Sequence, residues 1–243
     1  MKCIILAAGY ATRLYPLTEN FPKPLLKVGE KTILDHLIDD LKSGAEVDEF
    51  AVVTNHKFAS HFSQWAPEGV RVVDDMTSTN ETRLGAVRDI EFCLKSLGYK
   101  DDILVIAGDN VLDFSLNSFV RYAADKHASC IMRYYESEPA RLRKSAVVEV
   151  DLTDRVLTME EKPSEPRSNW CCPPFYYYTA DDAALIPQAI SEGCAVDAPG
   201  SFASYLAARR PLFAMQMKGR RYDIGTLESY KQVCQTYKGI TEI

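Results

Sequence analysis

The most constraining feature of the sequence is the alternation of strand-like and helix-like segments in its first half. Predominantly apolar runs at residues 2–7, 50–53, 70–73 and 103–107 predict strands, and the first of them is typical of a strand buried on both faces. Apolar residues at helical spacing separate them, at 33–41 and 84–97, and the second of these helices is expected to begin near residues 78–81. Strands that alternate with helices predict right-handed crossovers and a mostly parallel sheet.

The second half of the chain has shorter connections between its strand-like segments. We expect strands near residues 130–135, 146–150, 155–160 and 175–178, and helices near 181–190 and 226–237. Thr32 and Asp35 are expected to cap the helix at 33–41. The predicted fold class is therefore α/β, a Rossmann-like three-layer mixed sheet that is mostly parallel, with a smaller antiparallel portion. We expect a single domain over residues 1–243, with halves at 1–127 and 128–243.

Composition excludes several classes of protein. A formal net charge of −6 argues against a dedicated nucleic-acid-binding protein, because such proteins show a basic excess or a basic face. No apolar stretch approaches the roughly 20 residues that cross a bilayer, so no membrane association is expected. The seven cysteines include no CxxC pair, which predicts reduced thiols in a cytoplasmic protein.

The segment directly after the first strand is the most informative one. Residues 6–13 read LAAGYATR, and Lys23 follows Arg13 by ten residues. Small residues let backbone N–H groups approach phosphates, while the guanidinium of Arg13 and the ammonium of Lys23 suit phosphate oxygens. The loop lacks the Gly-Lys-Ser/Thr of a Walker motif and the second glycine of a dinucleotide fingerprint. A nucleotide-binding oxidoreductase is therefore disfavoured.

A carboxylate follows the strand at 103–107, in the sequence Gly108-Asp109-Asn110. The carboxyl ends of parallel strands meet at one edge of a sheet, so Asp109 is expected to face the same cleft as Arg13. Mg²⁺ typically binds one or two carboxylates together with phosphates and water. The sequence therefore predicts a magnesium site at this edge.

Four motifs follow one another in order: Thr-Arg-Leu with Pro-Lys-Pro-Leu-Leu near the N-terminus, Gly-Asp-Asn at 108–110, Glu-Glu-Lys-Pro at 160–163 and Tyr-Asp-Ile-Gly-Thr at 222–226. Together they resemble the signature of the sugar nucleotidyltransferase family, which includes glucose-1-phosphate thymidylyltransferases and their UTP- and CTP-using relatives. The resemblance runs from residue 1 to about residue 232. It implies an enzyme that transfers the nucleoside monophosphate of an NTP to a phosphorylated small molecule, most often a sugar 1-phosphate. Pyrophosphate is released and an NDP-sugar is formed.

The resemblance also implies roles for individual residues. It implies a first half that binds the nucleotide, a second half that binds the acceptor, a Mg²⁺ cofactor and a pyrimidine NTP (dTTP, UTP or CTP). A homo-oligomer is left open. The expected residues are Arg13, Lys23 and Lys162 for catalysis; Leu6, Ala8, Gly9, Tyr10, Ala11, Thr12, Asn80 and Gly85 for the nucleotide; Asn110, Glu161 and Lys162 for the acceptor; and Asp109 and Asp223 for the metal.

The sequence departs from the family at two places. Ala11 stands where many members have glycine, and the loop is expected to adopt a somewhat different path, with Tyr10 either stacking on the nucleotide or shielding it. Pro173 and Pro174 stand where glucose-using members have a glycine, and the segment 196–200 also differs, so we expect a rebuilt acceptor pocket in which Asp197 contacts hydroxyl groups. Hexose or heptose phosphates and phosphorylated alcohols are all left open.

Two other functions remain as alternatives. One is a cytidylyltransferase that acts on a non-sugar phosphate such as phosphocholine. The other is a catalytically inactive, regulatory nucleotidyltransferase-like subunit. The presence of Arg13, Lys23, Asp109 and Asp223 disfavours the inactive subunit.

Overall fold

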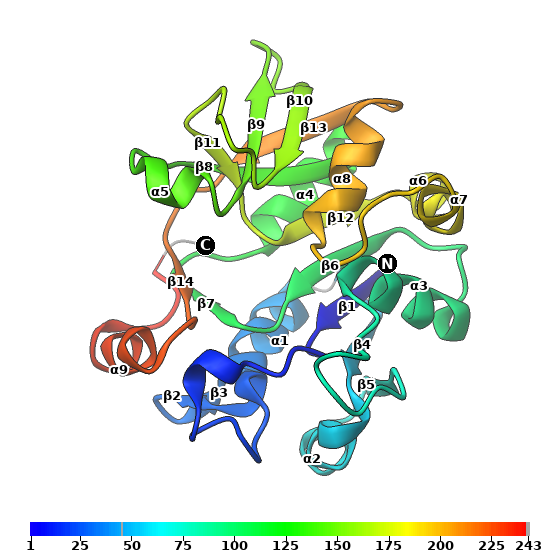
Figure 1. Ribbon diagram of the computed structural model, residues 1–243. Coiled ribbons are helices and arrows are strands. Elements are labelled where there is room, and N and C mark those ends of the chain that lie inside the picture. Colours follow the sequence, from blue (N-terminus) through cyan, green and yellow to red (C-terminus); the bar gives the residue numbers. More distant parts are fainter. Residues whose placement is uncertain (45, 242–243) are drawn as a thin grey trace. The chain divides into compact units, whose positions relative to one another are not determined.

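The computed structural model describes residues 1–44 and 46–241, and Figure 1 shows strands and helices following one another along the chain. Its contacts define two compact units, each assembled from separate stretches of sequence. Unit 1 comprises residues 1–83, 107–118 and the stretch from 218 onward, and unit 2 comprises 84–106 and 119–217. The assignment of nucleotide and acceptor to halves divided at residue 127 stays a prediction.

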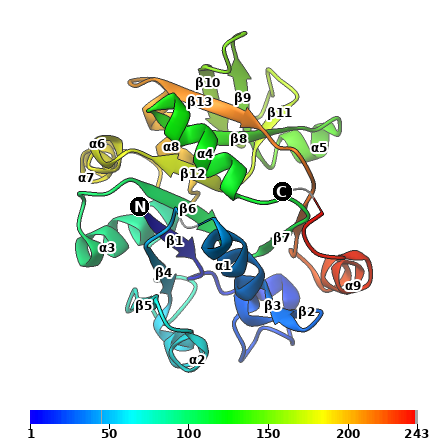
Figure 2. The same cartoon turned by 180° about the vertical axis from the view of Figure 1, so that it is seen from behind.

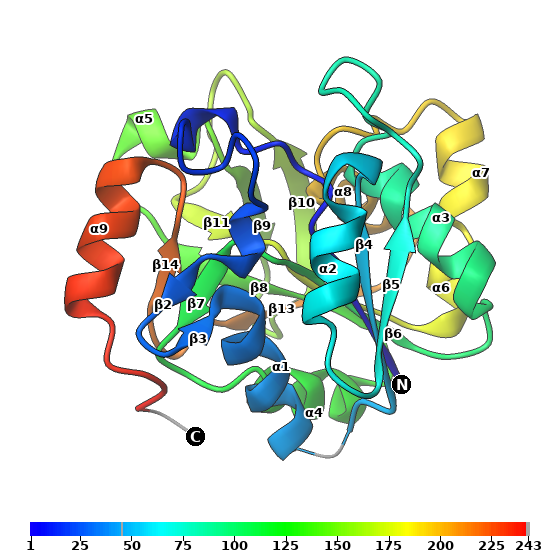
Figure 3. The same ribbon diagram turned by 90° about the horizontal axis from the view of Figure 1, so that it is seen from below.

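Unit 1 contains a parallel sheet of three strands, β1 (Lys2–Leu6), β4 (Glu49–Thr54) and β5 (Val70–Asp74). The apolar residues of β1 and β4 are largely buried, and Ile4, Ile5 and Val52 are 0% exposed, whereas in β5 only Val73 is buried. Figure 3 shows α2 (Ala59–Trp65) lying alongside β4 and β5, on which it packs. The predicted parallel arrangement is confirmed for these three strands.

The first long helix of unit 1 is capped as the sequence predicts. A hairpin of β2 (Lys27–Val28) and β3 (Lys31–Thr32) leads into α1 (Ile33–Ser43). The Asp35 N–H donates to Thr32 Oγ1 (3.0 Å), and the Thr32 N–H donates to Asp35 Oδ2 (2.9 Å). This capping box satisfies donors that the first turn of a helix otherwise leaves unpaired.

The last part of unit 1 joins the middle of the chain to its C-terminal stretch. β7 (Asn110–Leu112) pairs antiparallel with β14 (Arg221–Asp223), and α9 (Leu227–Thr236) follows, as Figure 1 shows in red. A second capping box, between Thr226 and Ser229, begins α9. The pairing places Asp223 opposite Asn110, although 113 residues separate them in sequence.

Unit 2 is built on a largely antiparallel sheet. Its strand order is β10 (Val156–Glu161), β9 (Ala146–Val150), β11 (Trp170–Cys172), β8 (Ser129–Tyr135), β12 (Phe175–Tyr178) and β6 (Ile103–Ala107), with β13 (Leu212–Gln216) parallel to β8. Figure 2 shows α4 (Asn117–Lys126) lying across β8 and β12, while α8 (Gly200–Ala207) packs on β10. The remaining helices are α3 (Ala86–Leu97), α5 (Pro139–Leu142), α6 (Ala180–Ala183) and α7 (Ile186–Ser191). The predicted α/β fold class is confirmed.

Two predicted helices differ from the observed ones. α3 begins at Ala86 and not near residues 78–81, because Gly85 has φ 89° and ψ 152°, a conformation outside the helical region. The helix expected at 181–190 is two short helices, α6 and α7, and Pro187 in the first turn of α7 has no N–H with which to continue a hydrogen-bonded helix from α6.

Two further observations concern the cysteines and the length and hydrophobicity of the helices. The structure shows no disulfide among the seven cysteines, all of which lie in its described residues, and five of them are buried. Within residues 1–44 and 46–241, no helix is both long and apolar enough to cross a membrane.

Candidate functional site

Three residues from distant parts of the sequence meet in unit 1. Lys23, in a single 3₁₀ turn (Lys23–Leu25), donates to Asp109 Oδ2 (2.7 Å) and to the carbonyl of Ile224 (3.0 Å). Asp109 lies one residue before β7, and Asp223 is the last residue of β14, the partner strand of β7. The pairing of β7 with β14 therefore brings the two predicted metal-binding carboxylates to one place.

A second layer holds Asp109 in position. Asn110 is 0% exposed, and its Nδ2 donates to Asp109 Oδ1 (2.6 Å). Arg221 Nη1 donates in turn to Asn110 Oδ1 (2.8 Å). The amide of Asn110 therefore orients Asp109, and its predicted contact with the acceptor stays untested. Arg221 was missed by the sequence analysis, although its position two residues before Asp223 on a strand places both side chains on one face.

The electrostatics of the two carboxylates differ. Burial raises the pKa of Asp109, but the neighbouring charges of Lys23 and Arg221 outweigh it and hold the pKa below its usual value. Desolvation and then the negative charge of Asp109 raise the pKa of Asp223 above its usual value. The two carboxylates thus repel one another, and a cation that both of them bind would reduce this repulsion.

Arg13 lies beside the same cluster. It belongs to a 3₁₀ turn, Thr12–Leu14, directly after the small-residue loop, and it is exposed. A Cβ placed on Gly225 would lie 3.5 Å from Asp223 Oδ2 and 3.9 Å from Arg13 Nη1, so Gly225 leaves space between these two side chains. The cluster therefore presents two cations, Arg13 and Lys23, around two carboxylates.

The loop between β1 and Arg13 is held by two side chains that the sequence analysis missed. Asn55, directly after β4, donates from Nδ2 to the carbonyl of Ala8 (2.9 Å), and Thr18 Oγ1 donates to the carbonyl of Ala11 (2.8 Å). Both side chains are fully buried. For Asn55 the sequence offered a signal: a polar residue directly after a strand expected to be buried needs a hydrogen-bond partner.

The structure bears on two expectations for this loop, its path at Ala11 and the role of Tyr10. Ala11 has φ 48°, the left-handed conformation that glycine adopts readily, so alanine does not divert the chain from it. Tyr10 is only 6% exposed and packs on Phe58 with 6.4 Å between ring centroids, so its ring offers little surface for stacking on a nucleotide. The other predicted nucleotide-binding residues of unit 1 are Leu6, Ala8, Gly9 and Thr12, which lie around the loop, and Asn80, which is exposed.

In unit 2, Glu161 ends β10 and Lys162 follows it. Lys162 is exposed and has φ 51°, and its N–H donates to the carbonyl of Ser145 (3.1 Å). A non-glycine residue held in this conformation costs free energy and is often found at a functional site. Burial raises the pKa of Glu161, although the positive charge of Lys162 opposes the shift.

Gly85 and Asp197 are also neighbours in unit 2. A Cβ on Gly85 would lie 2.6 Å from the carbonyl oxygen of Val196 and 3.2 Å from Asp197 Cα. Gly85 is therefore closely packed. The neighbour is the backbone of Val196, and Gly85 stands before the helix and not inside it.

Asp109 and Asp223 suit a magnesium ion better than a metal that takes all of its ligands from protein side chains. Within the described residues, no group of three or more His, Cys, Asp or Glu side chains is placed to hold a metal ion. Asp109 and Asp223 supply two hard oxygen donors whose mutual repulsion a divalent cation would relieve. Mg²⁺ commonly binds in this way, completing its shell with water and substrate phosphates.

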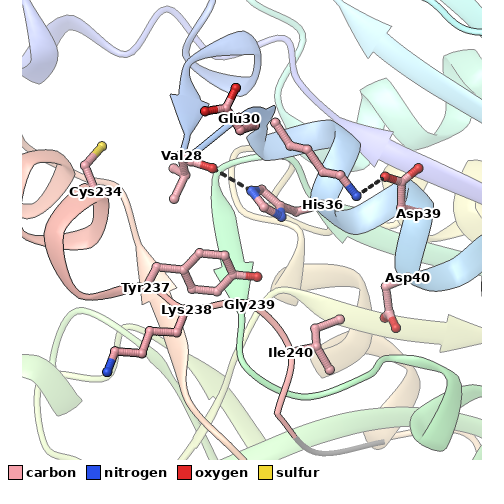
Figure 4. A pocket seen from close by; sticks show the side chains of 12 residues that line it. Val28, Glu30, His36, Asp39, Asp40, Cys234, Tyr237, Lys238, Gly239 and Ile240 are labelled. Atoms are coloured by element: carbon pink, nitrogen blue, oxygen red, sulfur yellow. Dashed lines mark hydrogen bonds and ion pairs between the residues drawn. The ribbon is translucent and has the colours of Figure 1, made fainter.

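A separate cavity of about 480 Å³ opens elsewhere in unit 1 (Figure 4). His36 Nε2 donates to the carbonyl of Val28 (2.8 Å), and Tyr237 lies edge-on to the imidazole with 5.1 Å between ring centroids. Lys31 and Asp39 form an ion pair (2.7 Å) at its edge. None of the predicted site residues, all of which the structure describes, lines this cavity.

Comparisons with known proteins place these residues in a family context. The family model described as nucleotidyl transferase matches residues 2–239. The UTP–glucose-1-phosphate uridylyltransferase AglF of Haloferax volcanii is 27% identical over 237 residues, covering 93% of this chain and 91% of AglF. The bifunctional protein GlmU of Methanococcus aeolicus is 31% identical over 173 residues, covering 70% of this chain but only 38% of GlmU.

A solved structure of similar fold is a UDP-glucose pyrophosphorylase complexed with UDP-glucose. It aligns with a TM-score of 0.82 at 20% identity, over 97% of each chain. At this level of identity the match establishes that the two proteins share a fold.

Proposed function

Because this chain belongs to the nucleotidyl transferase family, we propose that it transfers the nucleoside monophosphate of an NTP to a sugar 1-phosphate, releasing pyrophosphate. The observation that supports this most directly is the meeting of Arg13, Lys23, Asp109 and Asp223 in unit 1. They come from three stretches of sequence, and their charges are those that triphosphate chemistry requires. AglF and the thymidylyltransferases among the relatives are named for glucose 1-phosphate, which supports a sugar phosphate as acceptor.

In the proposed reaction, an oxygen of the acceptor phosphate forms a bond to the α-phosphorus of the NTP. The bond from the α-phosphorus to the oxygen bridging to the β-phosphorus breaks, and pyrophosphate leaves in line. Such a transfer depends on positioning and charge stabilisation, and it needs no covalent intermediate with the protein. The side chains that do this work are fixed cations and carboxylates.

The cations have distinct tasks in this proposal. Arg13 pairs with the leaving pyrophosphate through its planar guanidinium, which suits two phosphate oxygens at once. Lys23, already oriented by Asp109 and the Ile224 carbonyl, stabilises the charge that develops at the α-phosphate. Lys162 holds the acceptor phosphate, and Glu161 accepts hydrogen bonds from acceptor hydroxyls.

Asp109 and Asp223 would hold Mg²⁺, and Asn110 would keep Asp109 turned towards it. When bound, the ion supplies positive charge that lowers the repulsion between the two anionic substrates. In this structure Lys23 forms an ion pair with Asp109. Once a metal cation binds the Asp109 carboxylate, Lys23 can turn from it to a substrate phosphate.

The test is a matrix of dTTP, UTP, CTP and ATP against acceptors, with release of pyrophosphate measured in a coupled assay containing Mg²⁺. The acceptors are glucose 1-phosphate, N-acetylglucosamine 1-phosphate, other hexose and heptose phosphates, and phosphocholine. We expect turnover with a pyrimidine NTP and a sugar 1-phosphate. Turnover with phosphocholine alone would overturn the sugar assignment, and no turnover with any pair would overturn the enzymatic function.

A further inference from the structure

The segment Val196–Gly200 contacts two predicted binding positions in unit 2 at once. At one end it lies against Gly85, one of the residues that the sequence analysis expects to bind the nucleotide. At the other end Gly200 lies against Glu161, which the proposed function assigns to the acceptor. Both contacts lie within this one five-residue segment, and the ring of Pro199 restricts the backbone between them.

The contact with Gly85 is built from backbone groups. The N–H of Val87 donates to the carbonyl of Val196 (3.0 Å), and the N–H of Ala86 donates to the carbonyl of Asp197 (3.4 Å). These carbonyls thus accept from the first turn of α3, where many helices use the side chain of an N-cap residue. Gly85 permits the approach, since a Cβ there would overlap the Val196 backbone.

The contact with Glu161 is equally tight. A Cβ on Gly200 would overlap Glu161 Oε2 and would lie 3.3 Å from the hydroxyl of Tyr176. Gly200 and Tyr176 are buried, so the Glu161 carboxylate is seated on the first residue of α8. Any shift of this segment therefore moves the surface on which the carboxylate rests.

We propose that Val196–Gly200 couples the two substrate sites: the contact of the base with Gly85 fixes this segment, and the segment fixes Glu161 for the acceptor. The inference rests on the proposed function. Coupling of this kind is reciprocal, so the bound acceptor strengthens nucleotide binding by the same factor. Gly85 and Gly200 are then positioning residues. The coupling requires glycine at both positions because a Cβ would prevent the close contacts with Val196 and Glu161.

The critical variant is Ala86→Pro. Ala86 is the first residue of α3, a position where proline is well tolerated, and Gly85 before it has ψ 152°, which suits a residue preceding proline. The ring of proline replaces the N–H that donates to Asp197 and displaces the segment while the helix is retained. Ala86→Ser keeps the N–H and is the matched control.

The measurement is calorimetric titration of the acceptor, with and without a saturating α,β-methylene analogue of the NTP that supports turnover. Glucose 1-phosphate is the first acceptor probe, replaced by whichever acceptor the pyrophosphate assay favours. In the wild type and Ala86→Ser we expect the analogue to tighten acceptor binding about fivefold or more, and in Ala86→Pro we expect a ratio near one. Gly200→Ala should weaken acceptor binding about tenfold with or without the analogue, while affinity for the analogue alone stays unchanged.

Thermal unfolding of each variant identifies any that fail to fold, and Gly200→Ala then provides the second test, because alanine is favoured over glycine within a helix. A wild-type ratio near one, or an Ala86→Pro ratio equal to that of the wild type, would overturn the coupling alone. Unchanged acceptor affinity in Gly200→Ala would overturn the role of Gly200. Absence of turnover with every substrate pair would overturn the proposed function, and the coupling with it.

Discussion

At the scale of single residues, Asp109 has the most partners of any group in the predicted metal site. It accepts from Lys23 and from Asn110, and its charge raises the pKa of Asp223. A change that removes this charge but keeps the shape of the side chain separates its electrostatic role from its packing.

We predict that Asp109→Asn lowers kcat by about 100-fold or more, because one of the two proposed metal ligands and the ion-pair partner of Lys23 are lost together. Pyrophosphate release at saturating substrate measures this. Asp113→Asn, which removes a carboxylate that accepts from the Arg220 N–H, is the control for loss of charge in the same unit. A near-normal rate for Asp109→Asn would contradict the assignment.

Glu161 makes stability depend on pH. Its pKa is raised in the folded chain, chiefly by burial, so its ionisation opposes folding. This cost is fully present above the raised pKa and disappears as the pH falls below the pKa of the unfolded chain. Glu161→Gln should therefore unfold at higher denaturant concentration than the wild type at pH 7, with the difference shrinking as the pH is lowered towards 4.

Chemical denaturation at several pH values measures this difference. Glu160→Gln, at an exposed neighbouring position on β10, removes the same charge and serves as the control. A stability difference between Glu161→Gln and wild type that stays constant from pH 7 to pH 4 would show that the buried carboxylate is not its source.

At the scale of secondary-structure elements, the sequence predicted best where local chemistry decides the outcome. The apolar runs of β1, β4 and β6 and the Thr32 cap of α1 need no knowledge of distant residues, and all are observed. The prediction for the start of α3 was wrong because carbonyls of Val196 and Asp197, over 100 residues away, accept hydrogen bonds from the N–H groups of its first turn. The sequence analysis did not predict α8. Buried residues lie on nearly all of its faces, so its sequence lacks the alternation of apolar and polar residues at helical spacing.

The same distinction applies to the candidate site. Arg13, Lys23 and Asp109 follow strands or loops with recognisable motifs, so the sequence identifies them. Asn55 and Thr18 belong to no motif and act only through the carbonyls that they hold. Their role depends on the tertiary positions of β4 and the loop, which local patterns do not specify.

For the elements themselves, we predict that Thr32→Ala lowers the free energy of unfolding by about 1 kcal/mol. The substitution removes one half of the α1 capping box: the Asp35 N–H loses its acceptor, Thr32 Oγ1, while the backbone N–H at position 32 still donates to the Asp35 carboxylate. Urea denaturation followed by circular dichroism gives the value. Thr226→Ala removes the equivalent hydroxyl at α9, and equal effects at both helices would indicate that the cap is independent of its surroundings.

At the scale of the whole molecule, we expect the seven thiols to differ in reactivity because they differ in burial. Cys234 is exposed and Cys194 is partly buried, whereas the other five are buried. Burial also raises the pKa of Cys130 to about 12 and that of Cys3 further still, so their thiolate forms are disfavoured.

We therefore predict that Ellman's reagent titrates Cys234 rapidly and Cys194 slowly in the native protein, and all seven cysteines after denaturation. Cys234→Ser should remove the rapid phase and leave the others unchanged. Rapid reaction of three or more thiols in the native state would show that the buried positions open readily.

The interleaving of the two units also bears on how the chain is made. Synthesis on a ribosome delivers residues 1–83 first, but unit 1 includes β14 and α9, which lie after residue 217. Unit 2, by contrast, has all its residues once Met217 has emerged. Of the two units, the one whose first residues are made earlier is thus the one completed later, and Asp223 can join Asp109 only after all of unit 2 has been synthesised. A nascent chain stalled before residue 223 would hold Lys23 and Asp109 without the second carboxylate, so the triphosphate chemistry proposed here has to wait until unit 2 has been made and β14 has followed it.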